Sequence, residues 1–338
     1  MRAAGQEKGT VPAGCRSDFF WSDGCIEVRK TGVRLKVDRA LVAEVTQWLL
    51  YFALLTAAGL VARGQRRRQL TMCFAPDQPR PWYLIRGAAW WAGITVLPTG
   101  SDANAIFFFD DVTVSRRVET GNTPSYNFGC TDISKSHVAA IFAEVFGYAL
   151  SVDPRLVSGQ MVEKSEKNGV HDGRIVNGPV GPVAGHVYQR LVDTTDANDF
   201  AQDLRTLCAG GVPVLVWVKV KPAGHRFAIH NRAAFLRQPS EIFTAAELEL
   251  IRAFTLRIGL QWGGLDILRD RHSGRIYIVD VNKTDVGPVI ALSWRDKFRS
   301  MQCLSRALRN MIAAPLAAKP SATELPPGLQ SAMSNYEV

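Results

Sequence analysis

The feature that most constrains the fold of this chain is a pair of apolar strands near the C-terminus that each carry an acid. The stretches GGLDILRD and GRIYIVDVN place Asp266 on the first strand and Asp280 with Asn282 on the second. Residues 280 and 282 are two apart, so their side chains project from one face of a sheet. Burying a carboxylate among Ile and Val is costly unless a cation compensates it. Oxygen donors of this kind suit Mg²⁺ bridged to phosphates. The three residues therefore predict a magnesium–nucleotide site, with solvated strand-edge residues as the alternative.

Composition indicates a globular chain with enough length for two or three compact units. Its 338 residues are 47% hydrophobic and 21% charged, and the excess of Lys and Arg gives a net charge of +9. This charge suits nucleic acid, an anionic membrane or nucleotide phosphates, and it does not choose among them. The six cysteines form no CxxC pair, and no cleavable signal peptide is visible. We therefore expect reduced thiols in a cytoplasmic protein.

One apolar segment leaves membrane association open. Residues 41–62 carry a single charge, at Glu44, and an arginine-rich stretch from Arg63 to Arg68 follows at once. The uninterrupted apolar part, 48–62, is shorter than the roughly 20 residues that cross a bilayer. Three interpretations remain: a span, a peripheral surface anchor running from Leu41 to Arg68, and a buried helix.

Turn signals and hydrophobic periodicity divide the rest of the chain. Residues 1–69 are predicted to hold an irregular arm, up to about residue 38, and the apolar helix. Residues 70–131 show strand, helix, strand and strand, which indicates a small α/β unit with a largely parallel sheet. Residues 132–192 show a helix ending at Gly147 and three short antiparallel strands.

The next part, residues 193–313, is predicted to begin with a helix from Phe200 to Ala209. A β-branched strand follows, with Lys219 and Lys221 on one face. A long amphipathic helix, the two acid-bearing strands and a helix from Asp296 to Ala313 complete this part. Residues 314–338 are rich in Pro and Ser and are expected to form a flexible tail.

The two acid-bearing strands resemble the closing signature of the ATP-grasp superfamily, a strand with a metal-binding Asp followed by a strand with an acid, one spacer and Asn. The stretches GGLDILRD and YIVDVNKTDVGP occupy those places. The resemblance covers roughly residues 70–312. It implies an α/β (α+β) fold with a pre-grasp α/β domain, a small central lysine-bearing domain and a C-terminal metal-carboxylate domain.

The resemblance also implies roles for residues upstream. Lys135 matches the lysine at the entrance of the central domain, and Lys164 matches the strand lysine that meets the phosphates. The loop from Ser165 to Gly173 stands in the position of the flexible lid. In VYQRLVD, backbone groups of Arg190 and Leu191 would pair with adenine, while Gln189 stands where an acid is frequent.

Two cationic side chains are implied at the reacting phosphoryl group. Asp203 and Arg205 in QDLR resemble the start of the next family strand, and Lys219 or Lys221 would face that group. We therefore expect Arg205 and Lys219 to be catalytic. The chain departs from the pattern at Asp280, where Glu is common, and at Gln189.

The activity that the resemblance implies is that of an ADP-forming carboxylate–amine or carboxylate–thiol ligase with ATP and Mg²⁺. The expected partners are a small-molecule or peptide carboxylate and an amine, with no nucleic acid, and a homodimer is a reasonable expectation. Two other functions stay open: an ATP-grasp kinase acting on a hydroxyl, and a non-catalytic nucleotide-binding protein associated with a membrane. The sequence identifies neither the acid nor the nucleophile.

Overall fold

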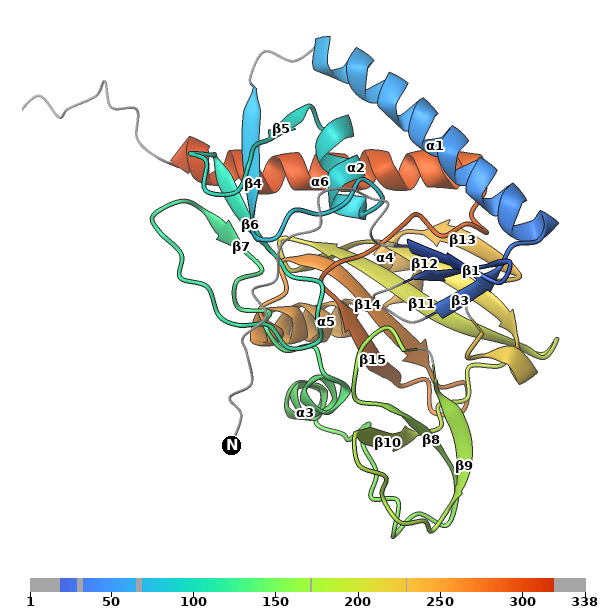
Figure 1. Ribbon diagram of the computed structural model, residues 1–338. Coiled ribbons are helices and arrows are strands. Elements are labelled where there is room, and N and C mark those ends of the chain that lie inside the picture. The colour runs from blue at the N-terminus through green and yellow to red at the C-terminus, as the bar shows by residue number, and fades with distance from the viewer. Residues whose placement is uncertain (1–18, 29–32, 65–68, 171, 229, 319–338) are drawn as a thin grey trace, which may run out of the picture.

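The largest sheet of the protein has five antiparallel strands. The computed structural model describes residues 19–28, 33–64, 69–170, 172–228 and 230–318. The strand order in this sheet is β13-β12-β11-β14-β15 (Figure 1). Its strands are β11 (Phe200–Ala209), β12 (Val212–Pro222), β13 (Ala233–Arg237), β14 (Trp262–Arg269) and β15 (Ile276–Asn282). Short helical turns η2 (Ala223–His225) and α4 (Pro239–Ile242) flank β13.

The helix predicted from Phe200 to Ala209 is wrong, because this segment is the central strand β11. It pairs with β12 on one side and with β14 on the other. Two ladders of backbone hydrogen bonds and apolar packing on both faces outweigh a helical preference that rested on a few local residues. The consequence for function is direct, because a strand directs Asp203 and Arg205 to the same face of the sheet.

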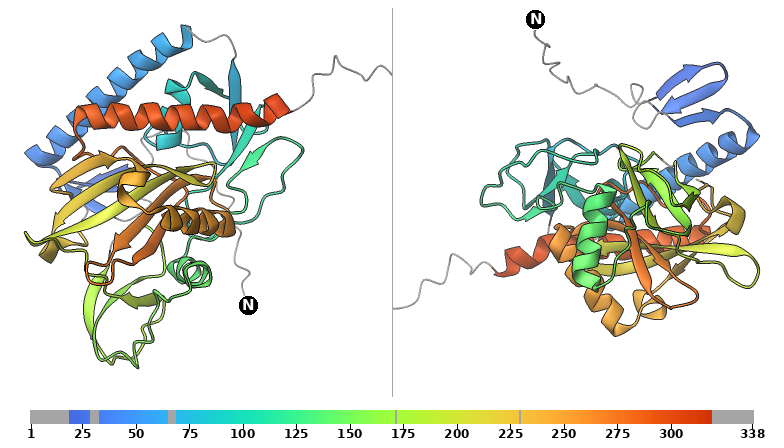
Figure 2. Two further views of the ribbon diagram at one scale, coloured as in Figure 1. Left: turned by 180° about the vertical axis from the view of Figure 1, so that it is seen from behind. Right: turned by 90° about the horizontal axis from the view of Figure 1, so that it is seen from below.

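Helices cover both faces of this sheet. On one face, α5 (Ala245–Ile258) and α3 (Lys135–Phe146) pack with buried strand residues such as Leu265 and Ile278 into one apolar cluster. On the other face, α6 (Trp294–Ala318) packs against Leu215 and Trp217. Figure 2 shows α6 crossing the molecule between this sheet and the smaller parallel sheet.

The small α/β unit has the parallel topology that the sequence predicts. Its strand order is β5-β4-β6-β7, and every pair is parallel. Helix α2 (Leu84–Trp91) connects the first two strands and packs against α6. The strands are β4 (Leu70–Pro76), β5 (Ile94–Val96), β6 (Ala105–Phe109) and β7 (Ser125–Tyr126).

Three short antiparallel strands follow α3, as predicted. Helix α3 ends where Gly147 adopts a left-handed conformation with φ 75°, which glycine tolerates without strain. The sheet then forms in the order β10-β8-β9. Its strands are β8 (Gly159–Ser165), β9 (Arg174–Gly178) and β10 (His186–Arg190).

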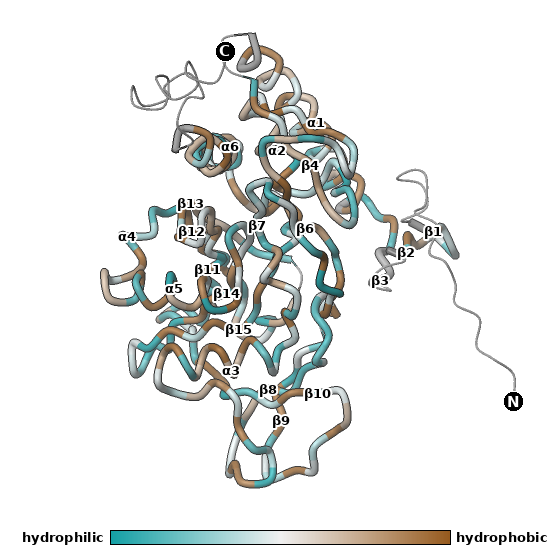
Figure 3. The backbone as a smooth tube through the Cα atoms, turned by 90° about the vertical axis from the view of Figure 1, so that its left-hand side faces the viewer, coloured by the Kyte–Doolittle hydropathy of each residue, from teal (hydrophilic) through white to brown (hydrophobic). Residues whose placement is uncertain are grey.

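The prediction of an irregular N-terminal arm is wrong for the described part of residues 1–38. Strands β1 (Phe19–Ser22), β2 (Cys25–Val28) and β3 (Val33–Lys36) form an antiparallel sheet that stands apart from the larger layers (Figures 2 and 3). The dipeptide Asp23–Gly24 supplies the positive φ angles, 50° and 70°, that a two-residue hairpin turn requires. Residues 1–18 lie outside the described part of the chain.

Helix α1 (Arg39–Gly64) follows this sheet, and the interpretation of its apolar segment as a buried helix is wrong. Leu41–Val61 is long and apolar enough to cross a membrane, yet only 11% of its 18-residue apolar stretch is buried. The predicted C-terminal tail begins later than residue 314, because α6 continues to Ala318. The remaining tail, 319–338, lies outside the described residues.

Candidate functional site

A cavity of about 480 Å³ lies between the β10-β8-β9 sheet and the five-stranded sheet. It brings together residues that are separated by up to about 150 positions in the chain. Every residue that the sequence analysis assigned to a metal, nucleotide or catalytic role lines this one cavity. These residues are Lys135, Lys164, Gln189, Arg190, Leu191, Arg205, Lys219, Asp266, Asp280 and Asn282.

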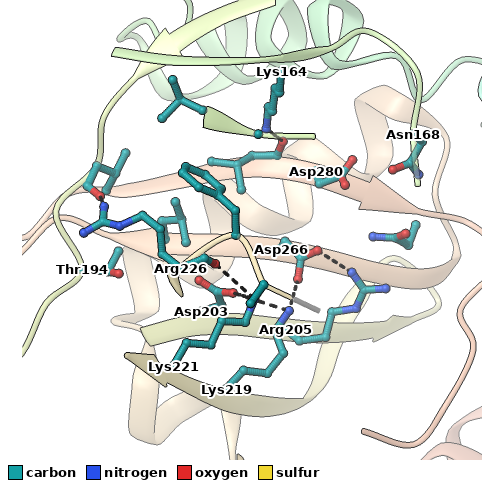
Figure 4. A pocket seen from close by; sticks show the side chains of 18 of the residues that line it. Lys164, Asn168, Thr194, Asp203, Arg205, Lys219, Lys221, Arg226, Asp266 and Asp280 are labelled. Carbon is teal, nitrogen blue, oxygen red and sulfur yellow. Dashed lines mark hydrogen bonds and ion pairs between the residues drawn. The ribbon is translucent and has the colours of Figure 1, made fainter. Parts of the chain in front are cut away.

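The acid-bearing strands β14 and β15 form one wall of the cavity. Asp266 and Asp280 are direct cross-strand partners, and a bulge follows between Asp266 and Ile267. The Asp270 carboxylate holds the turn at the other end of the hairpin, where it accepts a hydrogen bond of 2.7 Å from the N–H of Ser273. Because Asp266 and Asp280 are paired across the two strands, their carboxylates face the cavity side by side (Figure 4).

Two cations hold the Asp266 carboxylate. Arg205 Nη1 donates to Asp266 Oδ2 at 2.7 Å, and Lys219 Nζ donates to Oδ1 at 3.0 Å (Figure 4). Burial by itself would raise the pKa of Asp266, but Arg205 and Lys219 hold it well below its usual value. Asp266 is therefore held in its ionised form by two side chains predicted to be catalytic.

The same network continues along β11 and β12. The Asp203 carboxylate lies 3.8 Å from Lys219 Nζ and 3.3 Å from Lys221 Nζ. Lys221 also donates to the carbonyl of Arg226 at 3.2 Å, which ties the loop after η2 to the floor of the cavity. Alternation along β12 places both lysines on the cavity face, as the sequence predicts.

Asp285 belongs to this network and the sequence analysis missed it. Its carboxylate is 2% exposed and pairs with Arg205 Nη2. Burial raises the pKa of Asp285, although Arg205 opposes this shift. The structure also explains the glycine that precedes Leu265, because a Cβ atom on Gly264 would lie 2.6 Å from Asp285 Oδ2 and 2.8 Å from Arg205 Nε.

Asn282, predicted to bind metal, lies against the Arg205 guanidinium. With the side-chain amide oriented to satisfy its surroundings, its oxygen accepts a hydrogen bond from Arg205 Nη2 at 3.1 Å. Arg205 is thus surrounded by Asp266, Asp285 and Asn282.

The opposite wall carries the two lysines predicted to meet phosphates. Lys164 Nζ donates to the carbonyl of Val279 at 3.1 Å, and burial lowers its pKa to about 8. Lys135 is buried at the start of α3 and donates to the carbonyl of Lys167 at 2.8 Å. Burial raises the pKa of Asp280 even though both lysines act in the opposite direction.

The predicted lid loop connects β8 to β9 and covers the cavity. Asn168 anchors it twice, with its side-chain Nδ2 donating to the carbonyl of Val281 at 3.2 Å and its N–H donating to Thr113 Oγ1 at 2.9 Å. Gly169 has a φ of 78°, which a glycine adopts readily. His171 lies outside the described residues.

The predicted base-binding segment is only partly free to bind. The N–H of Arg190 donates to the carbonyl of Leu150 at 2.9 Å, so this group is already engaged. Gln189 is 2% exposed, and its side-chain Nε2 has no hydrogen-bond partner within the described part of the chain. A buried amide nitrogen at the wall of a cavity is stabilised by a ligand that offers an acceptor.

The charges of the cavity fit a polyanion. Among the described residues, seven Lys or Arg side chains and five Asp side chains line it. The excess of positive charge favours a ligand that carries several phosphates.

The donors also fit a magnesium ion that keeps water and phosphate oxygens as ligands. No cluster of three or more His, Cys, Asp or Glu side chains that could hold a metal occurs in the described residues. Mg²⁺ commonly binds to one or two carboxylates and completes its shell with phosphates. Asp266 has both oxygens engaged, whereas the hydrogen bond found for the Asp280 carboxylate in the described structure comes from the N–H of Val281.

Several solved structures are similar to this chain at low sequence identity. The ATP-grasp ligase PsnB, complexed with a minimal precursor, is 13% identical, with a TM-score of 0.47 and coverage of 74% of this chain and 99% of PsnB. A RimK domain ATP-grasp protein from Sphaerobacter thermophilus DSM 20745 is 10% identical, with a TM-score of 0.44 and coverage of 72% and 99%. The D-alanine–D-alanine ligase of Bacillus anthracis, complexed with ATP, is 9% identical, with a TM-score of 0.44 and coverage of 75% and 99%. No protein-family model and no curated protein sequence matches the chain.

Proposed function

We propose that this chain is an ATP-grasp ligase that binds Mg-ATP in the cavity between β8–β10 and β11–β15. One observation carries the proposal: ten residues selected from the sequence for a nucleotide site, spread from Lys135 to Asn282, all line that single cavity. Seven of the ten are charged, and charged residues from separate strands and a helix would not converge on one cavity if they were ordinary surface residues.

The nucleotide would lie with its phosphates between Lys164 and Lys219, which stand on opposite walls. The base would lie toward β10, where Gln189 offers its buried Nε2 and Leu191 offers an apolar side chain. Mg²⁺ would be held by Asp280 with Asp266 and Asn282. When bound, the metal would neutralise the phosphate charge during phosphoryl transfer.

The residues of the chain suit a reaction in two steps. A carboxylate oxygen of the acid substrate attacks the γ-phosphorus of ATP, and ADP leaves. The nitrogen of an amine, or the sulfur of a thiol, then attacks the carbonyl carbon of the acylphosphate. Inorganic phosphate leaves and the nucleophile loses a proton. Lys164, Lys219 and Arg205 stabilise the charge on the transferring group and on the departing phosphate.

A second candidate is a nucleotide-binding protein without turnover. It is favoured by the two cations that already neutralise Asp266, because a metal ligand with both oxygens engaged binds a metal less readily. The exposed helix α1 is compatible with such a membrane-associated protein.

Calorimetry tests the nucleotide site without knowledge of the acid. The purified protein is titrated with ATP, once in the presence of Mg²⁺ and once with a chelator in place of Mg²⁺. Mg-dependent binding supports the site, and no binding at millimolar nucleotide rejects it. Release of ADP and phosphate that requires both an acid and an amine or thiol supports the ligase. A stable phosphorylated alcohol identifies a kinase, and tight binding without turnover across an acid and amine screen favours the second candidate.

A further inference from the structure

Helix α1 is apolar on all sides, yet the protein covers it on one side only. A helix of this composition is normally surrounded by a protein core or by lipid. Large exposed apolar patches on soluble proteins mark sites of interaction. The exposed apolar side chains and their exposed fractions are Val42 55%, Val45 47%, Leu49 67%, Leu50 51%, Leu54 44%, Leu60 59% and Val61 65%.

The covered side of α1 is tightly fitted to α2. Tyr51, Leu55 and Gly59, spaced four residues apart, are buried. The indole Nε1 of Trp90 donates to the carbonyl of Thr56 at 3.1 Å, and a Cβ atom on Gly59 would lie 2.1 Å from that nitrogen. The middle of α1 is therefore packed against protein, so the helix is not surrounded by lipid in this structure. Its outer face is the part available to a partner.

A second cavity, of about 310 Å³, lies beneath α1 and contains a cation that has no partner among the described residues. It is lined mainly by apolar residues of α1, α2 and β5, and among the described residues that line it Arg86 is the one ionisable side chain. The described structure gives the Arg86 guanidinium no hydrogen bond and no ion pair. Its burial lowers the pKa of Arg86. An unpaired guanidinium in an apolar cavity is costly, and a phosphate or carboxylate would compensate it.

We propose that the outer face of α1, together with Arg86, docks this protein on the surface of an anionic lipid bilayer. The apolar side chains of α1 enter the boundary between headgroups and acyl chains, and Arg86 receives a lipid phosphate at the cavity beneath the helix. Charge in the sequence complements such a surface, because Arg63 and the run from Arg66 to Arg68 directly follow the apolar segment. Apolar helical faces combined with basic clusters bind anionic membranes.

A second copy of the chain is a poorer occupant of this face. It would bring the same net charge of +9 and the same unpaired Arg86. The acid on α1, Glu44, already lies 3.4 Å from His230 Nδ1. A lipid phosphate supplies the anion that another α1 lacks.

The experiment is co-sedimentation of the full chain with vesicles of phosphatidylcholine, with and without phosphatidylserine. The wild type is expected to sediment mainly with the phosphatidylserine vesicles. A double variant, Leu49→Asp with Leu60→Asp, is expected to partition at least tenfold less, because two exposed leucines no longer enter the apolar layer. Its matched control is Leu156→Asp with Leu256→Asp, which alters two leucines that are 80% and 78% exposed elsewhere on the surface.

Arg86→Gln tests the charge. It is expected to weaken binding to phosphatidylserine vesicles about fivefold, whereas Arg155→Gln, at an exposed arginine away from α1, leaves binding unchanged. Wild-type protein that sediments with neither vesicle overturns the proposal. Equal binding of both vesicle types, unaffected by Arg86→Gln, overturns it as well. A dimer that the double α1 variant converts to a monomer, without vesicle binding, assigns the face to a second copy instead.

Circular dichroism and calorimetry with Mg-ATP on the same variants separate this proposal from the nucleotide site. Because none of these residues lines the larger cavity, folded variants keep their nucleotide affinity whether or not they bind vesicles.

Discussion

Asp266 and Asp280 are direct partners across the β14–β15 pair, and their carboxylates have opposite pKa shifts. Burial raises the pKa of both groups. At Asp266 the contacts from Arg205 and Lys219 outweigh burial and lower the pKa, whereas at Asp280 burial outweighs the nearby lysines. Asp266 is therefore already compensated by protein cations, and Asp280 is the carboxylate that gains most from an added metal ion.

This difference predicts that the two carboxylates contribute unequally to stability near neutral pH. The lowered pKa of Asp266 means that its ionised form stabilises the fold, and this contribution is lost as the pH falls through the folded-state pKa. Asp266→Asn should lower the free energy of unfolding by roughly 3 kcal/mol, because it breaks two partly buried ion pairs. Asp280→Asn should change it by less than about 1 kcal/mol, since its charged form is disfavoured by burial. Urea unfolding of both variants checks this, and equal losses would contradict it.

Asp280 should control the response of nucleotide binding to magnesium. If the metal binds as proposed, Mg²⁺ increases the affinity of the wild type for ATP. In Asp280→Asn this increase in affinity should be at least tenfold smaller. Calorimetry with Mg²⁺ and with a chelator measures the difference for each protein. Asp102→Asn, at an exposed carboxylate outside the cavity, should retain the full gain.

Lys164 should make nucleotide affinity depend on pH in the mildly alkaline range. Its pKa of about 8 lies below the usual lysine value because of burial. The ammonium form binds phosphate, and its population falls as the pH rises through 8, so affinity should be about tenfold lower near pH 9 than near pH 7. Lys164→Arg stays charged over this range and should flatten the profile. A wild-type affinity independent of pH would contradict the combination of a lowered Lys164 pKa and a direct contact of Lys164 with phosphate.

Gly264 should be required for the position of Arg205. A Cβ atom there would lie 2.6 Å from Asp285 Oδ2 and 2.8 Å from Arg205 Nε, so Gly264→Ala must displace the buried ion pair. We expect a loss of about 1–3 kcal/mol in unfolding free energy and weaker nucleotide binding. Gly181→Ala is the control, because the space around Gly181 is open. This variant should leave both measurements within about 0.5 kcal/mol of the wild type. An unchanged Gly264→Ala protein would show that Arg205 can shift freely.

The sequence predicted most elements whose signal is local. The helix ending at Gly147, the three short strands after it and the β14–β15 hairpin follow from capping, alternation and turn residues. Residues 200–209 were misread as a helix because their environment, two neighbouring strands, is distant in the chain. The β1–β3 sheet was missed although Asp23–Gly24 is a hairpin signal, because its short strands lack strong alternation.

The sequence by itself determined which residues are candidates for the chemistry: the carboxylates of β14 and β15, the lysines of β8 and β12, and the polar residues at the end of β10. Only the tertiary structure decided how their charges are distributed. It showed that Arg205 stands between Asp266 and Asp285, that the N–H of Arg190 is engaged, and that α1 has an uncovered face. Residue types and spacings are local properties, whereas ion pairing, desolvation and exposure depend on which distant segments pack together.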